Sequence, residues 1–288
     1  MTINRKYVPP IYIHPILFIF IGISFVTGTF LSLFIILMIV FIHELGHYLM
    51  ASFFNWRIKK VTLWVFGGVM ETDEHASRPL YEEILVTIAG PVQHLFIYLF
   101  YFMFKQFEVF PDSILAMILL YNTMILVFNL LPVWPLDGGK FLFFCLSHFL
   151  PYRKAYDGTI LFSIIVCILS LVFFLLFNFN PFTLCLLIGF LMIENIVEWK
   201  RRYFVFLRFL LNRYHVDLDR VRKIKPIVVS SEEKLISVLQ LFQRDTKHFI
   251  YIIFPGQKRE RLDESKCLQS YFYEKQIHKT IGELVKNT

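Results

Sequence analysis

The chain has 288 residues, of which 57% are hydrophobic, and it carries a formal net charge of +7 at pH 7. A soluble protein is about half apolar, so this composition argues against an ordinary water-soluble domain and favours a protein that crosses a membrane several times. The positive charge does not indicate direct nucleic-acid binding, because the basic residues gather at the ends of the apolar segments.

Six apolar segments are each close to the length that a helix needs to span a membrane, about 20 residues. They cover residues 11–28, 30–54, 83–104, 113–131, 159–177 and 181–199. We expect the first to be retained, since no small-residue cleavage site follows it. Arginine and lysine precede the first segment and follow the second, fourth and sixth, whereas the alternate loops offer only Lys105. This asymmetry predicts that both termini are cytoplasmic.

The second segment contains His43-Glu44-Leu45-Gly46-His47. Residues four apart lie on one face of a helix, so the two imidazoles can bind one metal ion while Glu44 reaches a water beside it. H-E-x-x-H is the zinc-metalloprotease pattern, with two histidine ligands and a glutamate general base. An ionisable side chain inside a membrane costs roughly 2.5 kcal/mol or more, so three together are expected to serve a common partner, such as a metal.

Residues 62–72 follow the metal helix and read as a β-hairpin, because aromatic and β-branched residues flank Gly67 and Gly68. An extended peptide could add to the edge of such a hairpin by main-chain hydrogen bonds, which makes Phe66 a candidate substrate-binding residue. The alternative is a surface hairpin that lies at the membrane interface.

In the third segment, Ala89-Gly90-Pro91 predicts a kink and a close approach to another helix, with Gln93 or His94 facing the interior. Either side chain could support the metal ligands. A histidine in such a position is also often no more than a hydrogen-bonded interior residue.

Residues 129–139 end the fourth segment with two prolines and two glycines, so a continuous helix is not expected there. Broken backbone at membrane depth is tolerated where protein covers it or where it lines a wet cavity. Asp137 would then reach the depth of His43 and His47 and is our third zinc ligand. A solvated aspartate in an Asp-Gly turn is the alternative, and spacing alone does not decide between them.

The chain after residue 199 differs in composition. Residues 200–222 alternate basic and apolar side chains, which indicates a basic helical linker or a helix at an anionic membrane surface. Residues 223–288 predict a small domain of order β-α-β-β-α, whose first helix starts at a capping box, Ser230 to Glu233, and runs to about Gln243. The predicted domains are therefore 1–199, 200–222 and 223–288.

These motifs resemble those of the site-2 intramembrane metalloproteases. The resemblance is carried by the H-E-x-x-H pattern on a membrane helix, by Pro-x-x-Pro-Leu-Asp-Gly-Gly beginning at Pro132, and by Ala-Gly-Pro at 89–91. It extends over the whole chain, which is similar in particular to a member of the family that acts in sporulation. The tail from 223 resembles a single CBS module, although the ribose and phosphate signature of nucleotide-binding CBS sites is not evident.

The resemblance implies a polytopic α-helical membrane protein of about six transmembrane helices, with a short membrane-associated hairpin and a small α+β CBS-like cytoplasmic domain. It implies one Zn²⁺ per chain on His43, His47 and Asp137, with Glu44 as the catalytic base. The family's Asn- and Pro-rich approach to its Asp-Gly pair matches Asn129 and Pro135, which join Phe66 as candidate substrate-binding residues. The PDZ insert that is frequent in the family is absent, which leaves access of the substrate to the tail or to partner proteins.

The implied activity is zinc-dependent cleavage of a membrane-associated precursor, the pro-sequence of a sporulation sigma factor, in the membrane that surrounds the forespore. The implied partners are this substrate, membrane inhibitor or regulatory proteins, and a second copy through the CBS-like tail, which is also the candidate site for ATP. The rival function is a metal-ion transporter or channel that uses the membrane His and Asp residues. The glutamate between the histidines and the lack of an evident repeat among the segments favour the protease.

Overall fold

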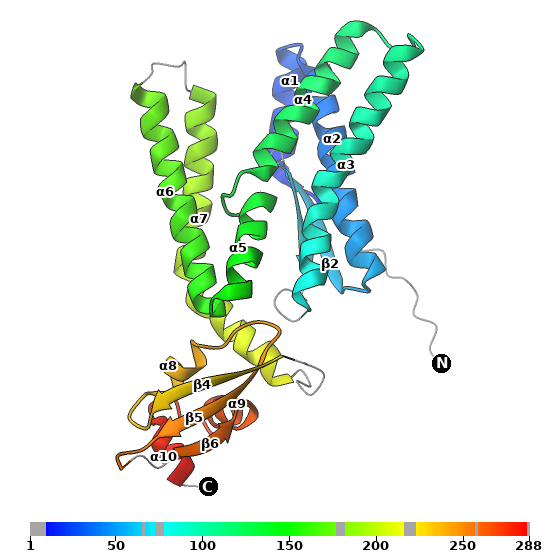
Figure 1. Ribbon diagram of the computed structural model, residues 1–288. Helices are drawn as coiled ribbons and strands as arrows, with labels where there is room; N and C mark the ends of the chain where they lie inside the picture. Colours follow the sequence, from blue (N-terminus) through cyan, green and yellow to red (C-terminus); the bar gives the residue numbers. More distant parts are fainter. Residues whose placement is uncertain are drawn as a thin grey trace. The chain divides into compact units, whose positions relative to one another are not determined.

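The structure is a computed structural model that describes residues 10–64, 67–72, 78–176, 182–215, 223–256 and 259–286. The chain forms two compact units. The first unit comprises Met1–Leu131 with Leu136–Gly138, and the second comprises Pro132–Pro135 with Gly139–Thr288. Figure 1 shows the elements of both units in the order of the sequence.

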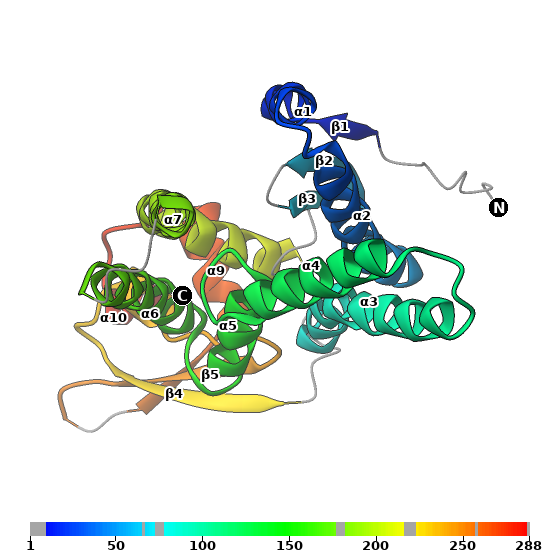
Figure 2. The same ribbon diagram turned by 90° about the horizontal axis from the view of Figure 1, so that it is seen from above.

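The first unit consists of helices and one small sheet. Its elements are α1 (Pro15–Val26), α2 (Phe30–Phe53), α3 (Leu80–Gln106), α4 (Asp112–Leu130), β1 (Ile11–Ile13), β2 (Ile58–Trp64) and β3 (Gly67–Thr72). Helix α2 packs against α3 and α4 and also against the sheet. Figure 2 shows β2 and β3 on one side of α2 and α3 on another. The helix that carries the histidines is therefore the centre of this unit.

Several helices have the length and hydropathy of membrane spans. In the part of the chain that the structure describes, four helices are long and apolar enough to cross a membrane, namely α2, α3, α4 and α6 (Tyr152–Leu176). Helix α1 has only 12 residues. The structure thus supports a membrane protein that crosses the bilayer several times, while the count of six remains a prediction.

The predicted first span begins too early. Residues 11–13 form strand β1, which pairs in parallel with β2, Tyr12 lying opposite Thr62. The helix starts only at Pro15, which suits the first turn of a helix and restricts the residue before it to extended backbone. The apolar pattern cannot show this difference, because a short apolar strand and the start of an apolar helix have the same composition.

The predicted hairpin is confirmed. Strands β2 and β3 are antiparallel, with Thr62 opposite Val69 and Leu63 opposite Gly68. Residues 65 and 66 between them, including the candidate residue Phe66, lie outside the described residues. In the described part of this sheet the strand order is β1-β2-β3, so β3 is an edge strand.

The predicted break after the fourth span is also confirmed, but a helix follows it that was not expected. Helix α4 ends at Leu130, and α5 (Asp137–Phe149) begins directly on the Asp-Gly-Gly sequence. Glycine disfavours helix, which hides this start from a reading by propensity. Glycine is needed at this helix start for a steric reason, since a Cβ on Gly138 would lie 2.3 Å from the carbonyl oxygen of Leu130.

The second unit contains long helices that extend beyond their apolar parts. Helix α6 starts at Tyr152 rather than at 159, and α7 (Phe182–His215) continues through the basic residues from Lys200 to Arg213. Charged residues indicate where a membrane span stops, but the helix itself can continue through them. Phe206, Phe209 and Leu210 on this part of α7 are buried. The division of the chain into three domains remains a prediction.

The predicted C-terminal domain, residues 223–288, has the predicted order of elements in its described part, followed by one more short helix. These are β4 (Ile224–Ser230), α8 (Leu235–Leu239), β5 (Lys247–Ile253), β6 (Arg259–Asp263), α9 (Glu264–Phe272) and α10 (Ile281–Lys286). Strands β4 and β5 are parallel, and β5 and β6 are antiparallel. The order alone does not establish a CBS domain.

The predicted capping box does not start a helix at Ser230. Helix α8 begins only at Leu235, and its N-cap residue Lys234 makes no side-chain cap. The hydrogen bonds of the box are present, since Ser230 N–H donates to Glu233 Oε1 (3.5 Å) and Glu232 N–H donates to Ser230 Oγ (3.4 Å). The next residues bond to the segment before α10, because Ile281 N–H donates to Glu233 O (2.9 Å) and Lys234 forms an isolated antiparallel β-bridge with Thr280. A tertiary contact has therefore overridden a local helix signal.

Candidate metal centre

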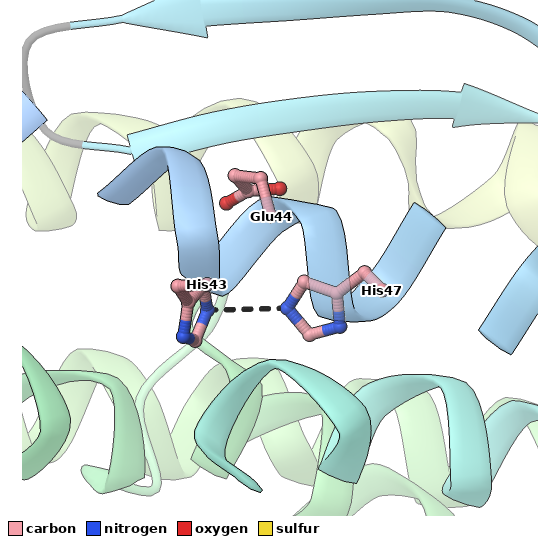
Figure 3. A group of neighbouring side chains, drawn as sticks. All are labelled: His43, Glu44 and His47. Atoms are coloured by element: carbon pink, nitrogen blue, oxygen red, sulfur yellow. Dashed lines mark hydrogen bonds between the residues drawn. The ribbon is translucent and has the colours of Figure 1, made fainter. Parts of the chain in front are cut away.

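The two histidines lie one turn apart on α2 and face the same way. Their Nε2 atoms are 3.1 Å apart, and the residues His43 and His47 are only 3% and 7% exposed. Figure 3 shows Glu44 projecting from a different side of the helix, toward the strands. The ligand-capable atoms of the three residues all lie within 4.8 Å of one another. The helical spacing thus gives the arrangement that the sequence predicts.

Asp137 joins this pair from the start of α5. Its Oδ2 atom lies 3.1 Å from Nε2 of His43 and 3.1 Å from Nε2 of His47. The side chain is 5% exposed, so it is not a solvated residue in a surface turn. The structure therefore brings together all four residues that the sequence analysis assigns to the metal and its chemistry.

Helix α3 can approach the histidines because it has a glycine at the point of contact. A Cβ on Gly90 would lie 2.3 Å from Nε2 of His47 and 2.9 Å from Cε1 of His43. Gly46 on α2 is equally restricted, since its Cβ would lie 2.4 Å from the carbonyl oxygen of Ala89. Small residues allow helices in a membrane to pack this closely. The close approach predicted at Ala89-Gly90-Pro91 is confirmed.

The other ring nitrogen of each histidine has a hydrogen-bond partner. Nδ1 of His47 lies 2.7 Å from the carbonyl oxygen of Val86, and Nδ1 of His43 lies 3.1 Å from Nε2 of His94. A carbonyl oxygen can only accept, so Nδ1 of His47 carries the proton in the neutral ring. Its Nε2 therefore presents a lone pair toward Asp137.

The three converging atoms fit a zinc ion. They form a triangle with edges of 3.1 Å. A tetrahedral zinc site with metal–ligand distances of about 2.0–2.1 Å has corners about 3.3–3.4 Å apart. An imidazole lone pair and a carboxylate oxygen repel each other at this distance unless a proton or a cation lies between them. The donor set of two imidazoles and one carboxylate is one that zinc takes in catalytic sites.

The three candidate substrate-binding residues lie in different parts of the fold. Asn129 lies near the end of α4, where its Nδ2 donates to the carbonyl oxygen of Ile125 (3.0 Å). Pro135 lies in the second unit, in the loop that precedes Asp137, and Phe66 is outside the described residues. Their role in binding a substrate remains a prediction.

Sequence reasoning missed Asn122 on α4, which is fully buried and bonds to His94 at 2.7 Å. The signal was present, because an amide in a mostly apolar segment needs a hydrogen-bond partner inside a membrane. The pattern could not show which partner it has, since that depends on how α3 and α4 pack.

Comparisons with known proteins agree with this site. The sequence matches the profile described as Peptidase family M50 over residues 31–110 and 105–173. Stage IV sporulation protein FB of Bacillus subtilis (strain 168) is 39% identical over 275 residues, which cover 96% of each chain. A zinc metalloprotease of Methanocaldococcus jannaschii is 35% identical over 147 residues, or 48% of this chain and 42% of that protein.

A solved structure shares the fold. The site-2 protease from Methanocaldococcus jannaschii matches with a TM-score of 0.54 and 27% identity, and the match covers 68% of this chain and 93% of that chain. The sequence relatives and the structural match thus point to the same kind of enzyme, which favours a protease over a transporter. The chain belongs to peptidase family M50, the intramembrane metalloproteases of the site-2 type.

Proposed function

We propose that this chain is a zinc-dependent intramembrane endopeptidase in which His43, His47 and Asp137 hold one Zn²⁺ and Glu44 is the general base. The observation that carries this assignment is the triangle of Nε2, Nε2 and Oδ2 atoms with edges of 3.1 Å, buried inside a membrane protein. Three ligands from the protein leave a fourth position of a tetrahedral site for water or substrate, as in catalytic zinc sites.

The chemistry divides between the metal and the protein. A zinc ion bound here supplies Lewis-acid chemistry, since it lowers the pKa of water to about 7 and polarises a carbonyl. Glu44 accepts the proton of the attacking water and then delivers it to the leaving amine nitrogen. Its position next to His43 and within 4.8 Å of the ligand nitrogens suits this role.

A substrate helix must unwind before it can be cleaved, because its carbonyls are held in hydrogen bonds to the fourth residue along. Strand β3 offers an edge to which an extended segment can add by main-chain hydrogen bonds. It packs against α2, and Figure 3 shows strands on the side of the helix from which Glu44 projects. Asn129, Pro135 and Phe66 are our candidates for contacts that hold the unwound segment.

We infer that the substrate is the pro-sequence of a sporulation sigma factor. The support is the relative named Stage IV sporulation protein FB, which aligns with 96% of this chain. With such a substrate the protein belongs in the membrane around the forespore, with both termini in the cytoplasm. Membrane proteins that inhibit or regulate cleavage are then the expected partners.

The C-terminal domain is proposed to be CBS-like and regulatory. Its β-α-β-β-α order supports this assignment. Pairing with a second copy and binding of ATP are both predictions. If ATP is the effector, it changes cleavage by the full chain and leaves unchanged the cleavage by a chain that lacks the domain.

The direct test is cleavage of a purified pro-sigma factor by the purified chain in detergent or liposomes, with and without a chelator. We expect a shortened product, its loss on chelation, and its return when zinc is restored. Cleavage that continues at full rate after complete removal of metal, verified by elemental analysis, would contradict the proposal.

A further inference from the structure

A third histidine, His94, contacts the ring nitrogen of His43 that does not face Asp137. His94 on α3 is fully buried, and its Nε2 lies 3.1 Å from Nδ1 of His43. Its Nδ1 lies 2.7 Å from Oδ1 of Asn122 on α4, which is also fully buried. Asn122 in turn donates from Nδ2 to the backbone carbonyl of His94 (3.3 Å). The three side chains thus form one buried chain of hydrogen bonds across α2, α3 and α4.

The position of each proton in this chain follows from one constraint. The carbonyl oxygen of His94 can only accept, so the NH2 group of Asn122 faces it and the amide oxygen faces Nδ1 of His94. Nδ1 of His94 therefore carries a proton, and Nε2 of the neutral ring is an acceptor. Nδ1 of His43 must then be the donor, which leaves the lone pair of His43 on Nε2.

This tautomer is the one that the metal centre needs. Nε2 of His43 is the atom that lies 3.1 Å from Oδ2 of Asp137, and only a nitrogen without a proton can bind a metal. In the other tautomer a proton on Nε2 would point at Asp137 and occupy the place of the ion. His47 obtains the same tautomer from the backbone carbonyl of Val86, so no side-chain change can remove it there.

We propose that His94 and Asn122 are positioning residues that hold His43 in the tautomer and ring orientation that bind zinc. This inference rests on the proposed function, because it takes His43 as a zinc ligand. His94 is not a ligand itself, since its Nε2 accepts from His43 and its Nδ1 donates to Asn122. Partners of this kind typically contribute 10–100-fold to metal affinity.

The test measures zinc affinity of the full chain in detergent by competition with a chelator. His94→Phe keeps an aromatic side chain but removes the acceptor, and we expect a 10–100-fold weaker affinity. His94→Gln places an amide oxygen near the position of Nε2, and we expect affinity within a few-fold of wild type. Asn122→Leu is expected to weaken zinc affinity when it is the only substitution. Combined with His94→Phe it should cause no further loss of zinc affinity, because Asn122 acts through His94.

The matched control is Tyr98→Phe, which removes another hydrogen bond between α3 and α4, the one between Tyr98 and Thr123 (2.9 Å), which is exposed and does not involve His94 or Asn122. Its zinc affinity is expected to equal that of wild type. A second readout is the absorption spectrum of the cobalt-loaded chain, which reports ligand geometry and is expected to change for His94→Phe but not for Tyr98→Phe.

The outcomes distinguish the positioning role of His94 and Asn122 from the zinc site itself. Wild-type affinity in His94→Phe overturns this inference and leaves the metal site standing. Equal losses in His94→Phe and His94→Gln also overturn it, because they indicate a packing role. If His94→Phe does not fold, Asn122→Leu and His94→Gln still give the comparison. A wild-type chain that binds no zinc removes the proposed function and this inference with it.

Discussion

Gly90 shows how little space separates α3 from the metal-facing side chains. A methyl group there would lie 2.3 Å from Nε2 of His47, far inside van der Waals contact. Either the imidazole rotates away or the helices separate, and both movements break the triangle formed by the two Nε2 atoms and Oδ2 of Asp137. A glycine in a helix lowers helix stability by about 1 kcal/mol relative to alanine, so its presence here is explained by the close contact.

We therefore expect Gly90→Ala to lose zinc while Gly158→Ala keeps it. Gly158 lies inside α6, and a Cβ added to it would meet nothing within 4 Å, so alanine is tolerated there. Elemental analysis of the two purified variants, with circular dichroism as a check on folding, makes the comparison. Full zinc occupancy in a folded Gly90→Ala chain would show that the α2–α3 contact is looser than described.

Asp137 provides the second test at this scale. Asp137→Asn replaces a carboxylate by a neutral amide, which is a poorer ligand for a divalent cation, so zinc affinity should fall by at least about tenfold. Asp157→Asn is the control, because Asp157 pairs with Arg153 on α6 (3.9 Å) and has no part in the triangle. Equal zinc affinities for the two variants, measured by chelator competition, would remove Asp137 from the ligand set.

The residues of the site differ in how well the sequence predicts them. His43, Glu44 and His47 lie within about one turn of one helix, so the helical period alone predicts their geometry. Asp137 could be found only through the Pro-rich break and the family motif, since its approach to the histidines depends on packing. His94 remained ambiguous and Asn122 was missed, because hydrogen bonds between helices leave no period in a sequence.

At the scale of elements, the loop before Asp137 is held by two polar side chains. The backbone N–H of Trp134 donates to Oγ of Ser163 on α6 (2.9 Å), and Nδ2 of Asn195 on α7 donates to the carbonyl oxygen of Trp134 (2.5 Å). Both side chains are fully buried. Irregular backbone at membrane depth needs such partners, because water is not available to satisfy its polar groups.

We expect Asn195→Leu to disorder this loop and to weaken zinc binding, since the Trp134 carbonyl would lose its donor. An unsatisfied buried group costs about 1–3 kcal/mol. Ser147→Ala is the matched control, because the Ser147 hydroxyl bonds to Phe144 within α5 (3.0 Å) and not to the loop. Thermal unfolding and zinc affinity are the measurements. A stability and affinity for Asn195→Leu equal to those of Ser147→Ala would show that the loop holds its shape without Asn195.

Long helices and the hairpin could be predicted, whereas β1, α5 and the full length of α7 could not. Apolar runs and the Gly-Gly pair are local signals, and they identified α2, α3, α4 and the β2–β3 pair correctly. Strand β1 exists because it pairs with β2, and α5 starts on glycines because of close packing. Each of these elements depends on a contact that is distant in sequence, which local propensity does not record.

At the scale of the whole molecule, α7 connects the loop before Asp137 with the predicted C-terminal domain. Asn195 on α7 bonds to that loop, and Arg213 on the same helix donates to both carboxylate oxygens of Glu264 and to the carbonyl of Gln243. Glu264 is fully buried and also accepts from His248 N–H (2.9 Å). We propose that a ligand or partner that moves the predicted C-terminal domain acts on the loop through this helix.

We expect Arg213→Met to loosen the C-terminal domain and to lower cleavage of the natural substrate while zinc stays bound. Removing one partner of a buried ion pair costs roughly 3–5 kcal/mol, because Glu264 is left as an uncompensated charge. Arg208→Met, at an exposed position on the same helix, is the control. Limited proteolysis, zinc content and cleavage are measured together. Unchanged cleavage by a chain whose domain is demonstrably loosened would refute control through α7.

The measurement that tests the central claim most directly combines zinc content with cleavage in Glu44→Gln. Glutamine keeps the size of the side chain, and Glu44 is not one of the three proposed ligands, so zinc should bind as in wild type. The amide cannot accept the proton of the attacking water, so cleavage should be abolished. A zinc-loaded variant without cleavage is the predicted result. A variant that cleaves the proposed substrate, a pro-sigma factor, at the wild-type rate would contradict the account.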